Sequence, residues 1–133
     1  QQRHQFVIMS TRMTSLSAAE FAELGRRTAR CKLSKSIKVN ERRFKLQFGS
    51  PPDVVSDAWE LIIESDFIRN GDVLGNKDPN PIHFLWSLML LKQCPTWDVL
   101  ANTLRVDENA VKKWGMLCLE ACAELDAQVV GCV

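Results

Sequence analysis

The segment TWDVLANTLRVDENAVKKWG, residues 96–115, decides the fold that we expect for this chain. Thr96 is a suitable cap for a short helix, and Asp107 is a suitable cap for a second, long helix. Only residues 105–107 separate the two. A short helix, a three-residue turn and a second helix are typical of a helix-turn-helix, which we therefore expect over residues 96–128.

The side-chain pattern of this segment agrees with that geometry. Two helices that cross steeply need a small residue at their closest approach, which Ala101 provides, and an apolar plug in the turn, which Val106 provides. Arg105 departs from the pattern, because the first turn residue usually adopts a left-handed conformation that favours glycine, and a side chain there costs about 1 kcal/mol. A plain helical hairpin with no nucleic-acid role is the alternative. The apolar residues on the inner faces are Leu100, Leu104, Val111 and Trp114.

The outward residues at the start of the long helix would meet the major groove of DNA. Asparagine can pair with adenine, lysine with guanine or phosphate, and glutamate with cytosine. Two lysines are offset by Asp107 and a glutamate, so the local charge is weak for a DNA-binding surface. The expected contacts are Glu108, Asn109, Lys112 and Lys113, with Arg105 from the turn.

Charge is distributed unevenly along the chain. Residues 1–49 contain 11 basic and 3 acidic residues, a net charge of +8, whereas residues 50–133 contain 6 basic and 13 acidic residues, a net charge of −7. A basic arm on an acidic body indicates contact with a polyanion or nuclear targeting, so we expect a nuclear protein. We add Arg42 and Arg43 to the expected DNA contacts. A solvated, mobile N-terminus is the alternative.

Two regions are expected from the remaining patterns. Residues 1–39 should form a basic, largely flexible arm with a short helix over 17–30, where Ser17 and Glu20 fit a capping box. Residues 40–133 should form an all-α domain, a small helical bundle that contains the helix-turn-helix.

Three more helices are expected in this domain. The first should run from its cap Asn40 to a stop at Gly49. The second should have Ser50 as its cap and Pro51 at its first position, and should end near residue 66. A loop is expected over 69–81. The third helix, over 82–91, is apolar nearly all round and belongs in the centre of the bundle, with His83 as a surface or packed neutral histidine.

The composition is that of an ordinary globular chain, with 46% apolar and 25% charged residues. Five scattered cysteines, an odd count, favour reduced thiols inside the cell over a disulfide framework. The longest strongly apolar run, residues 84–91, is too short to span a membrane, so we expect no membrane contact.

Catalytic and metal sites find little support in the sequence. Cys118 and Cys122 are four residues apart on a helix, as two metal ligands can be. They also lie on an apolar stripe, and no Cys or His pair elsewhere has motif spacing, so core packing is favoured and we expect no metal or cofactor. No phosphate-binding loop, dinucleotide fingerprint or nucleophile elbow is present, and we assign no catalytic residue.

Four stretches resemble a known family. They are RFKLQFG at 43–49, VVSDAW at 54–59, PIHFLWSL at 81–88 and DENAVKKW at 107–114. They are similar to the region that precedes the catalytic domain in Harbinger-like transposases, and the resemblance covers residues 43–130, about two-thirds of the chain. In that family a helical domain with a helix-turn-helix precedes a ribonuclease-H-like domain, in which three carboxylates bind magnesium and the enzyme cuts and joins DNA.

The resemblance implies DNA binding without catalysis, because the catalytic domain would follow the long helix and this sequence stops at Val133. We expect a fragment, a degenerate element copy or a domesticated remnant. The family also implies a partner, since such transposases are thought to act with a separate Myb-like protein. The first hypothesis is a transposase-derived domain that binds duplex DNA. The alternative is a helical protein-interaction module or a non-functional remnant without specific DNA binding, and the oligomeric state is not predicted.

Overall fold

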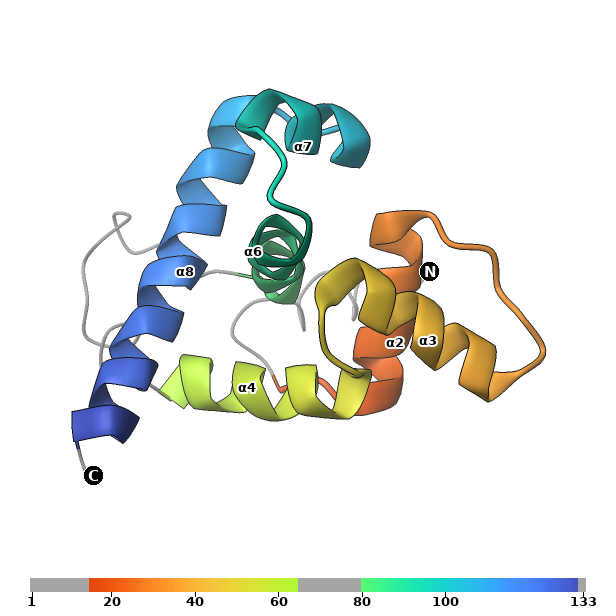
Figure 1. The fold of residues 1–133 in the computed structure, drawn as a ribbon, viewed down its shortest axis with the longest axis horizontal. Coiled ribbons are helices and arrows are strands. Elements are labelled where there is room, and N and C mark those ends of the chain that lie inside the picture. Colours follow the sequence, from red (N-terminus) through yellow and green to blue (C-terminus); the bar gives the residue numbers. More distant parts are fainter. Residues whose placement is uncertain (1–14, 65–79, 132–133) are drawn as a thin grey trace, which may run out of the picture.

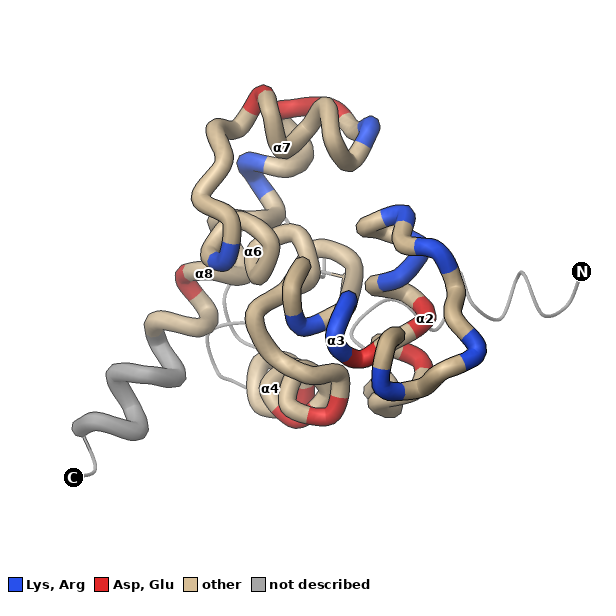
Figure 2. Tube along the Cα trace, turned by 45° about the vertical axis from the view of Figure 1, so that its right-hand side comes forward, with Lys and Arg blue, Asp and Glu red and all other residues tan. Residues whose placement is uncertain are grey.

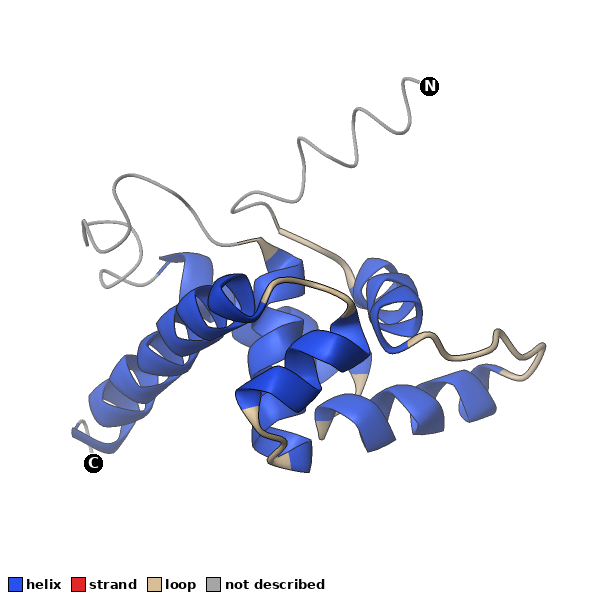
Figure 3. Cartoon of the chain, turned by 90° about the horizontal axis from the view of Figure 1, so that it is seen from above, coloured by secondary structure: helices blue, strands red, loops and turns tan. Residues whose placement is uncertain are grey.

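A computed structural model of the chain describes residues 15–64 and 80–131, with side chains described as far as residue 123. The described residues form helices and no strand, which confirms the all-α class (Figures 1 and 3). The expectations for residues 1–14 and for 65–79, which include most of the expected loop, fall outside the described residues. In chain order the helices are α2 (Ala18–Ala29), α3 (Ile37–Phe48), α4 (Pro52–Glu64), α6 (Pro81–Gln93), α7 (Trp97–Leu104) and α8 (Glu108–Gly131).

Helix α6 lies at the centre of the bundle, and Figure 1 shows it end-on between α8 and the pair α2 and α3. Phe84, Leu85 and Met89 of this helix are at most 1% exposed. The ring of Phe84 stacks on Trp59 of α4, with centroids 5.8 Å apart. A helix that is apolar nearly all round can be buried on every side, as the sequence predicted for this segment.

Helix α2 forms as expected, and Ser17 and Glu20 make the predicted capping box. It belongs to the packed body, however, and residues 16–29 are not part of a flexible arm. Phe21 is fully buried, and α2 packs against α3, α4 and α6. The sequence could not show this, because the apolar stripe of α2 is thin and its burial depends on partners that lie far along the chain.

Gly25 sets the separation of α2 and α3. A Cβ atom at this position would lie 2.4 Å from Cε2 of Phe44 and 2.9 Å from Cε2 of Phe48. These two rings are four residues apart and face the same side of α3, with centroids 4.7 Å apart. The two helices can therefore approach only because α2 has no side chain here.

Helix α3 begins earlier than the sequence predicted. Ser36 is its cap, since the Ser36 hydroxyl accepts a hydrogen bond of 3.4 Å from the Val39 N–H. Asn40 lies inside the helix and holds the preceding loop, because its side chain accepts from the Ser34 N–H and donates to the Ser34 carbonyl, both at 2.8 Å. Serine and asparagine are equally good caps, so the sequence alone could not separate them.

The next boundary is shifted by one residue. Gly49 ends α3 in a left-handed conformation with φ 88°, as predicted. Helix α4 starts at Pro52, and the Val55 N–H donates to the carbonyl of Pro51, so Pro51 rather than Ser50 precedes the helix. With two consecutive prolines the sequence does not decide which of them is the first residue of the helix, because proline is accepted at either position.

Candidate nucleic-acid interface

Helices α7 and α8 are joined by the three-residue connection that the sequence predicted. Arg105 adopts the left-handed conformation expected of the first turn residue, with φ 58° and ψ 46°. Its N–H donates to the carbonyl of Asn102 at 3.3 Å, and the N–H of Val106 donates to the carbonyl of Ala101 at 3.0 Å. This pair of bonds is a Schellman motif, which ends a helix and redirects the chain. That the unit is a DNA-binding helix-turn-helix stays a prediction.

The inner faces of the two helices are closed by apolar packing. Ala101 is 5% exposed and Val111 is fully buried, while Val106 and Trp114 pack against the core from partly buried positions. Gly115 of α8 faces Trp97 of α7, and an added Cβ would be 3.5 Å from its ring, an ordinary contact distance. This packing fixes α8 against α7 and turns the opposite side of its first turns to solvent.

The start of α8 presents the predicted polar residues. A carboxylate oxygen of Asp107 accepts from the N–H groups of Asn109 and Ala110, at 3.1 and 3.3 Å, so Asp107 caps the helix as expected. The residues assigned to the major groove are all exposed: Glu108, Asn109, Lys112 and Lys113. Arg105 is exposed as well.

Lys113 is positioned by an aromatic stack. Its Nζ lies 5.5 Å from the ring centroid of Trp114, within the range of a cation–π contact. The imidazole of His83 on α6 also stacks on the Trp114 ring, with centroids 4.3 Å apart and 10° between the planes. The stack connects the first turns of α8 to the centre of the bundle.

His83 is a packed neutral histidine, one of the two readings that the sequence left open. It is 8% exposed, and its Nδ1 accepts a hydrogen bond of 2.9 Å from the N–H of Asn80. Burial lowers the pKa of His83 to about 4, because the charged form would lose its hydration. The ring therefore acts as an uncharged support for Trp114 at neutral pH.

Two arginines that the sequence did not single out lie beside the α7–α8 turn. A cavity of about 220 Å³ is lined by Arg27 and Arg30 from the end of α2, by Leu104 at the end of α7 and by Val106 in the turn. Arg30 has the same left-handed conformation as Arg105, with φ 59°. The C-terminal ends of α2 and α7 thus face each other, as Figure 1 shows. Nothing in the sequence places these ends together.

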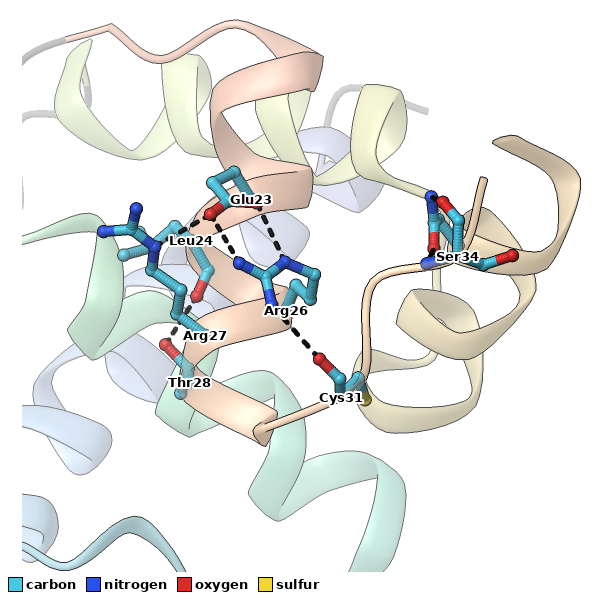
Figure 4. A network of polar contacts seen from close by, with 8 residues as sticks. Glu23, Leu24, Arg26, Arg27, Thr28, Cys31 and Ser34 are labelled. Atoms are coloured by element: carbon cyan, nitrogen blue, oxygen red, sulfur yellow. Dashed lines mark hydrogen bonds and ion pairs between the residues drawn. The ribbon is translucent and has the colours of Figure 1, made fainter. Parts of the chain in front are cut away.

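Glu23 organises the basic end of α2 (Figure 4). Arg26 donates to both carboxylate oxygens, at 2.9 and 2.7 Å, and Nε of Arg27 donates to one of them at 2.8 Å. These bonds, that of Arg26 first, lower the pKa of Glu23 to about 2. The side chain of Arg27 remains 70% exposed, so this contact orients its guanidinium while leaving it accessible to solvent.

Arg42 and Arg43 lie elsewhere. Both are on α3, and Figures 1 and 3 show α3 and α8 on opposite sides of the molecule. Nη1 of Arg43 donates to the carbonyl of Lys32 at 2.6 Å, which fastens the loop that precedes α3. The structure therefore brings Arg105, Lys112 and Lys113 into one unit and places the two α3 arginines apart from it.

Figure 2 shows how charge is distributed over the fold. Lys and Arg gather on the end of α2, the loop that follows it and α3, whereas α4 carries Asp and Glu and no basic residue. Asp53, Asp57 and Glu64 of α4 are exposed to solvent, and Glu60 is partly exposed. The positive charge of residues 26–45 thus forms a surface of the folded body.

The described residues offer no candidate for a metal site or for a membrane-spanning segment. Among the side chains that the structure describes, residues 15–64 and 80–123, no group of three or more His, Cys, Asp or Glu could hold a metal ion. Cys118 is fully buried in the core, and burial raises its pKa to about 12, while Cys122 packs beside it. None of the described helices has the length and apolar character needed to cross a membrane.

Comparison of the chain with protein-family models, with curated proteins and with solved structures found no match.

Proposed function

We propose that this chain is a DNA-binding helical domain without catalytic activity, in which the first turns of α8 enter the major groove of a duplex. One observation carries the proposal: Asn109, Lys112 and Lys113 form an exposed row directly after a tight interhelical turn. The resemblance to Harbinger-like transposases supports the same reading, and with it a nuclear location and a separate DNA-binding partner protein. In this proposal Asn109 reads adenine and Lys112 reads guanine.

The arginines beside the turn supply charge that the start of α8 lacks. Lys112 and Lys113 are balanced by Asp107 and Glu108, which oppose the approach of phosphate. Arg105 and the cavity residues Arg27 and Arg30 add three positive charges at the same end of the molecule. We assign these three arginines to phosphates that flank the groove, because phosphate contacts set the register in which a helix reads bases. Arg42 and Arg43 receive no base contact.

The test is a series of titrations of fluorescent duplex DNA at several salt concentrations. Replacement of both Lys112 and Lys113 by alanine should weaken binding and reduce the slope of log K against log salt by about 1, since Lys112 reads guanine while Lys113 meets a phosphate, and each phosphate contact contributes about 0.9. A matched control removes two exposed lysines of α3, Lys38→Ala with Lys45→Ala. The control should change affinity much less.

Equal losses in the two double variants would contradict the proposal. That outcome would mean that the chain attracts DNA as an unspecific polycation, and the protein-interaction module or the remnant without specific binding would replace it. Arg27→Ala with Arg30→Ala should weaken binding to all sequences alike, whereas Asn109→Ala should reduce the preference between sequences.

A further inference from the structure

A row of basic side chains runs along the outer side of α3. Lys38, Arg42 and Lys45 are exposed and follow one another after four and three residues, the spacing that places side chains on one face of a helix. The next position on this face is Gly49, where α3 ends. A Cβ added to Gly49 would lie 3.7 Å from Cδ of Lys92 on α6, so this exposed lysine extends the row. The basic row thus consists of Lys38, Arg42, Lys45 and Lys92.

The charges of the basic row are not neutralised within the fold. Among the side chains of residues 15–64 and 80–123, no ion pair involves any of the four. The single acidic residue of α3, Glu41, lines a cavity of about 520 Å³ between α2 and α3, which none of the four residues lines. From residue 38 to residue 49 the helix rises about 16 Å, at about 1.5 Å per residue. An unpaired line of cations of this length is a surface for an extended polyanion.

The basic row lies far from the start of α8. Phe44 and Phe48, which are 4% and 2% exposed, hold the other side of α3 in the core, so the row points out of the body. Helices α3 and α8 lie on opposite sides of the molecule (Figures 1 and 3), and Lys and Arg gather along α3 (Figure 2). A straight duplex held against the first turns of α8 therefore passes on the far side of the body from α3.

The backbone of a nucleic acid fits the basic row better than a membrane surface does. Each strand of DNA carries one phosphate per about 3.4 Å, so a row of about 16 Å faces about five phosphates of one strand. Helices that lie on membranes combine basic residues with a broad apolar face. The basic row contains no apolar residue, and Leu46, which is 61% exposed, lies at its border.

We propose that the basic row binds the phosphate backbone of a second DNA segment, so that one chain bridges two duplexes. The first duplex is the one assigned to α8, and the inference rests on that proposed function. The second duplex is held without regard to its sequence, because phosphate contacts carry no sequence information. Four phosphate contacts give a slope of about 3.6 in log K against log salt, so bridging should fall steeply as salt rises.

The test asks whether the chain holds two duplexes together. A duplex of about 15 base pairs, about 50 Å long, is fixed to beads and captures the whole chain. A second, fluorescent duplex is then added, and the fluorescence retained on the beads measures bridging. The wild-type chain should retain the second duplex at low salt and lose it at high salt. Arg42→Glu should reduce retention about tenfold or more, because a contact is lost and a like charge then faces the phosphates.

Lys32→Glu is the matched control, since it makes the same change of charge at an exposed residue that lines the α2–α3 cavity, away from the basic row. It should retain the second duplex nearly as well as the wild-type chain, with the same helix content by circular dichroism. Sedimentation velocity with excess duplex should give two duplexes per wild-type chain and one for Lys38→Ala with Lys45→Ala.

The variants separate failure of this inference from failure of the proposed function. If Arg42→Glu bridges as well as the wild-type chain while Lys112→Ala with Lys113→Ala loses the first duplex, the second site is overturned and the proposed function stands. If Lys112→Ala with Lys113→Ala keeps full affinity for a single duplex and Arg42→Glu loses it, the basic row is the DNA surface, and both the α8 interface and bridging are overturned.

Two further outcomes would also overturn bridging. One is a chain that engages a single long duplex through α8 and the basic row together and retains no second duplex. The other is a chain that retains no second duplex but binds vesicles of anionic phospholipid, with that binding lost in Arg42→Glu, because a membrane would then be the polyanion that the basic row contacts.

Discussion

The imidazole of His83 lies parallel to the indole of Trp114, with ring centroids 4.3 Å apart and 10° between the planes. The contact joins the start of α6 to the second turn of α8, and Lys113 lies over the same indole at 5.5 Å. The position of a proposed DNA-contacting lysine is therefore coupled to a buried histidine that must stay neutral. Protonation of His83 would disturb both the core and this end of α8.

This coupling makes stability depend on pH in a defined window. The pKa of His83 is about 4 in the folded chain, and its ordinary value is 6.5. Between these values the unfolded chain binds more protons, so the free energy of unfolding should fall as pH decreases from 6.5 towards 4. The slope approaches about 1.4 kcal/mol per pH unit. Urea denaturation at about pH 7.5 and about pH 5 measures this change.

The control for the pH effect is His83→Phe, which keeps an aromatic ring but cannot titrate. Its free energy of unfolding should be nearly the same at the two pH values. Glu23 does not interfere, because its lowered pKa, about 2, makes its contribution disappear only below its ordinary value of 4.5. A wild-type protein equally stable at both pH values would show that the imidazole is hydrated.

A second prediction concerns the close approach of α2 and α3. Gly25→Ala should destabilise the chain by about 1–3 kcal/mol, because the added methyl group would overlap the rings of Phe44 and Phe48. Gly115→Ala is the matched control within a helix. Its Cβ would meet Trp97 at an ordinary contact distance of 3.5 Å, so the higher helix propensity of alanine should leave stability unchanged or raise it by up to about 1 kcal/mol.

Thermal and urea denaturation of the two glycine variants check this prediction. If Gly25→Ala were as stable as the wild-type chain, the separation of α2 and α3 would have to be larger than the structure shows.

Local signals predicted much of the fold, because many helix ends depend on only a few neighbouring residues. Ser17, Thr96 and Asp107 cap helices as expected, and Gly49 ends one. The position of α6 was also predictable, since a helix without a polar face can only be central. The prediction that Asn40 caps α3 is wrong, because Ser36 has that role four residues earlier.

Contacts between helices could not be predicted from these local sequence signals. Phe21 is fully buried, and its helix α2 packs against three other helices that come later in the chain. The thin apolar stripe of α2 alone does not predict this burial. Arg27 and Arg30 belong to the candidate site only because the ends of α2 and α7 meet. Asn109 and Lys112 are exposed, as predicted from the sequence, whereas their contact with DNA stays a prediction.

A third prediction follows from the environments of the cysteines. Cys94 is exposed and should react rapidly with a thiol reagent, whereas Cys118 is fully buried, and burial raises its pKa to about 12. Reaction requires the thiolate, so Cys118 should react only when the chain unfolds. Mass spectrometry after brief labelling in native buffer and in urea identifies each thiol. Rapid native labelling of Cys118 would mean that α8 leaves the core, and Cys94→Ser should remove the fast reaction.

A fourth prediction is that a substitution in the turn between α7 and α8 changes stability and DNA affinity in opposite directions. Arg105 has φ 58°, a conformation that glycine adopts without strain, so Arg105→Gly should raise the free energy of unfolding by up to about 1 kcal/mol. The same change removes a proposed phosphate contact and should weaken DNA binding, with a salt slope lower by about 1. Cys94→Gly, at φ 51°, relieves the same strain without loss of charge, so it should stabilise the chain and leave DNA affinity unchanged. Equal DNA affinity for Arg105→Gly and the wild-type chain would remove Arg105 from the interface, while greater stability would still confirm its strained backbone.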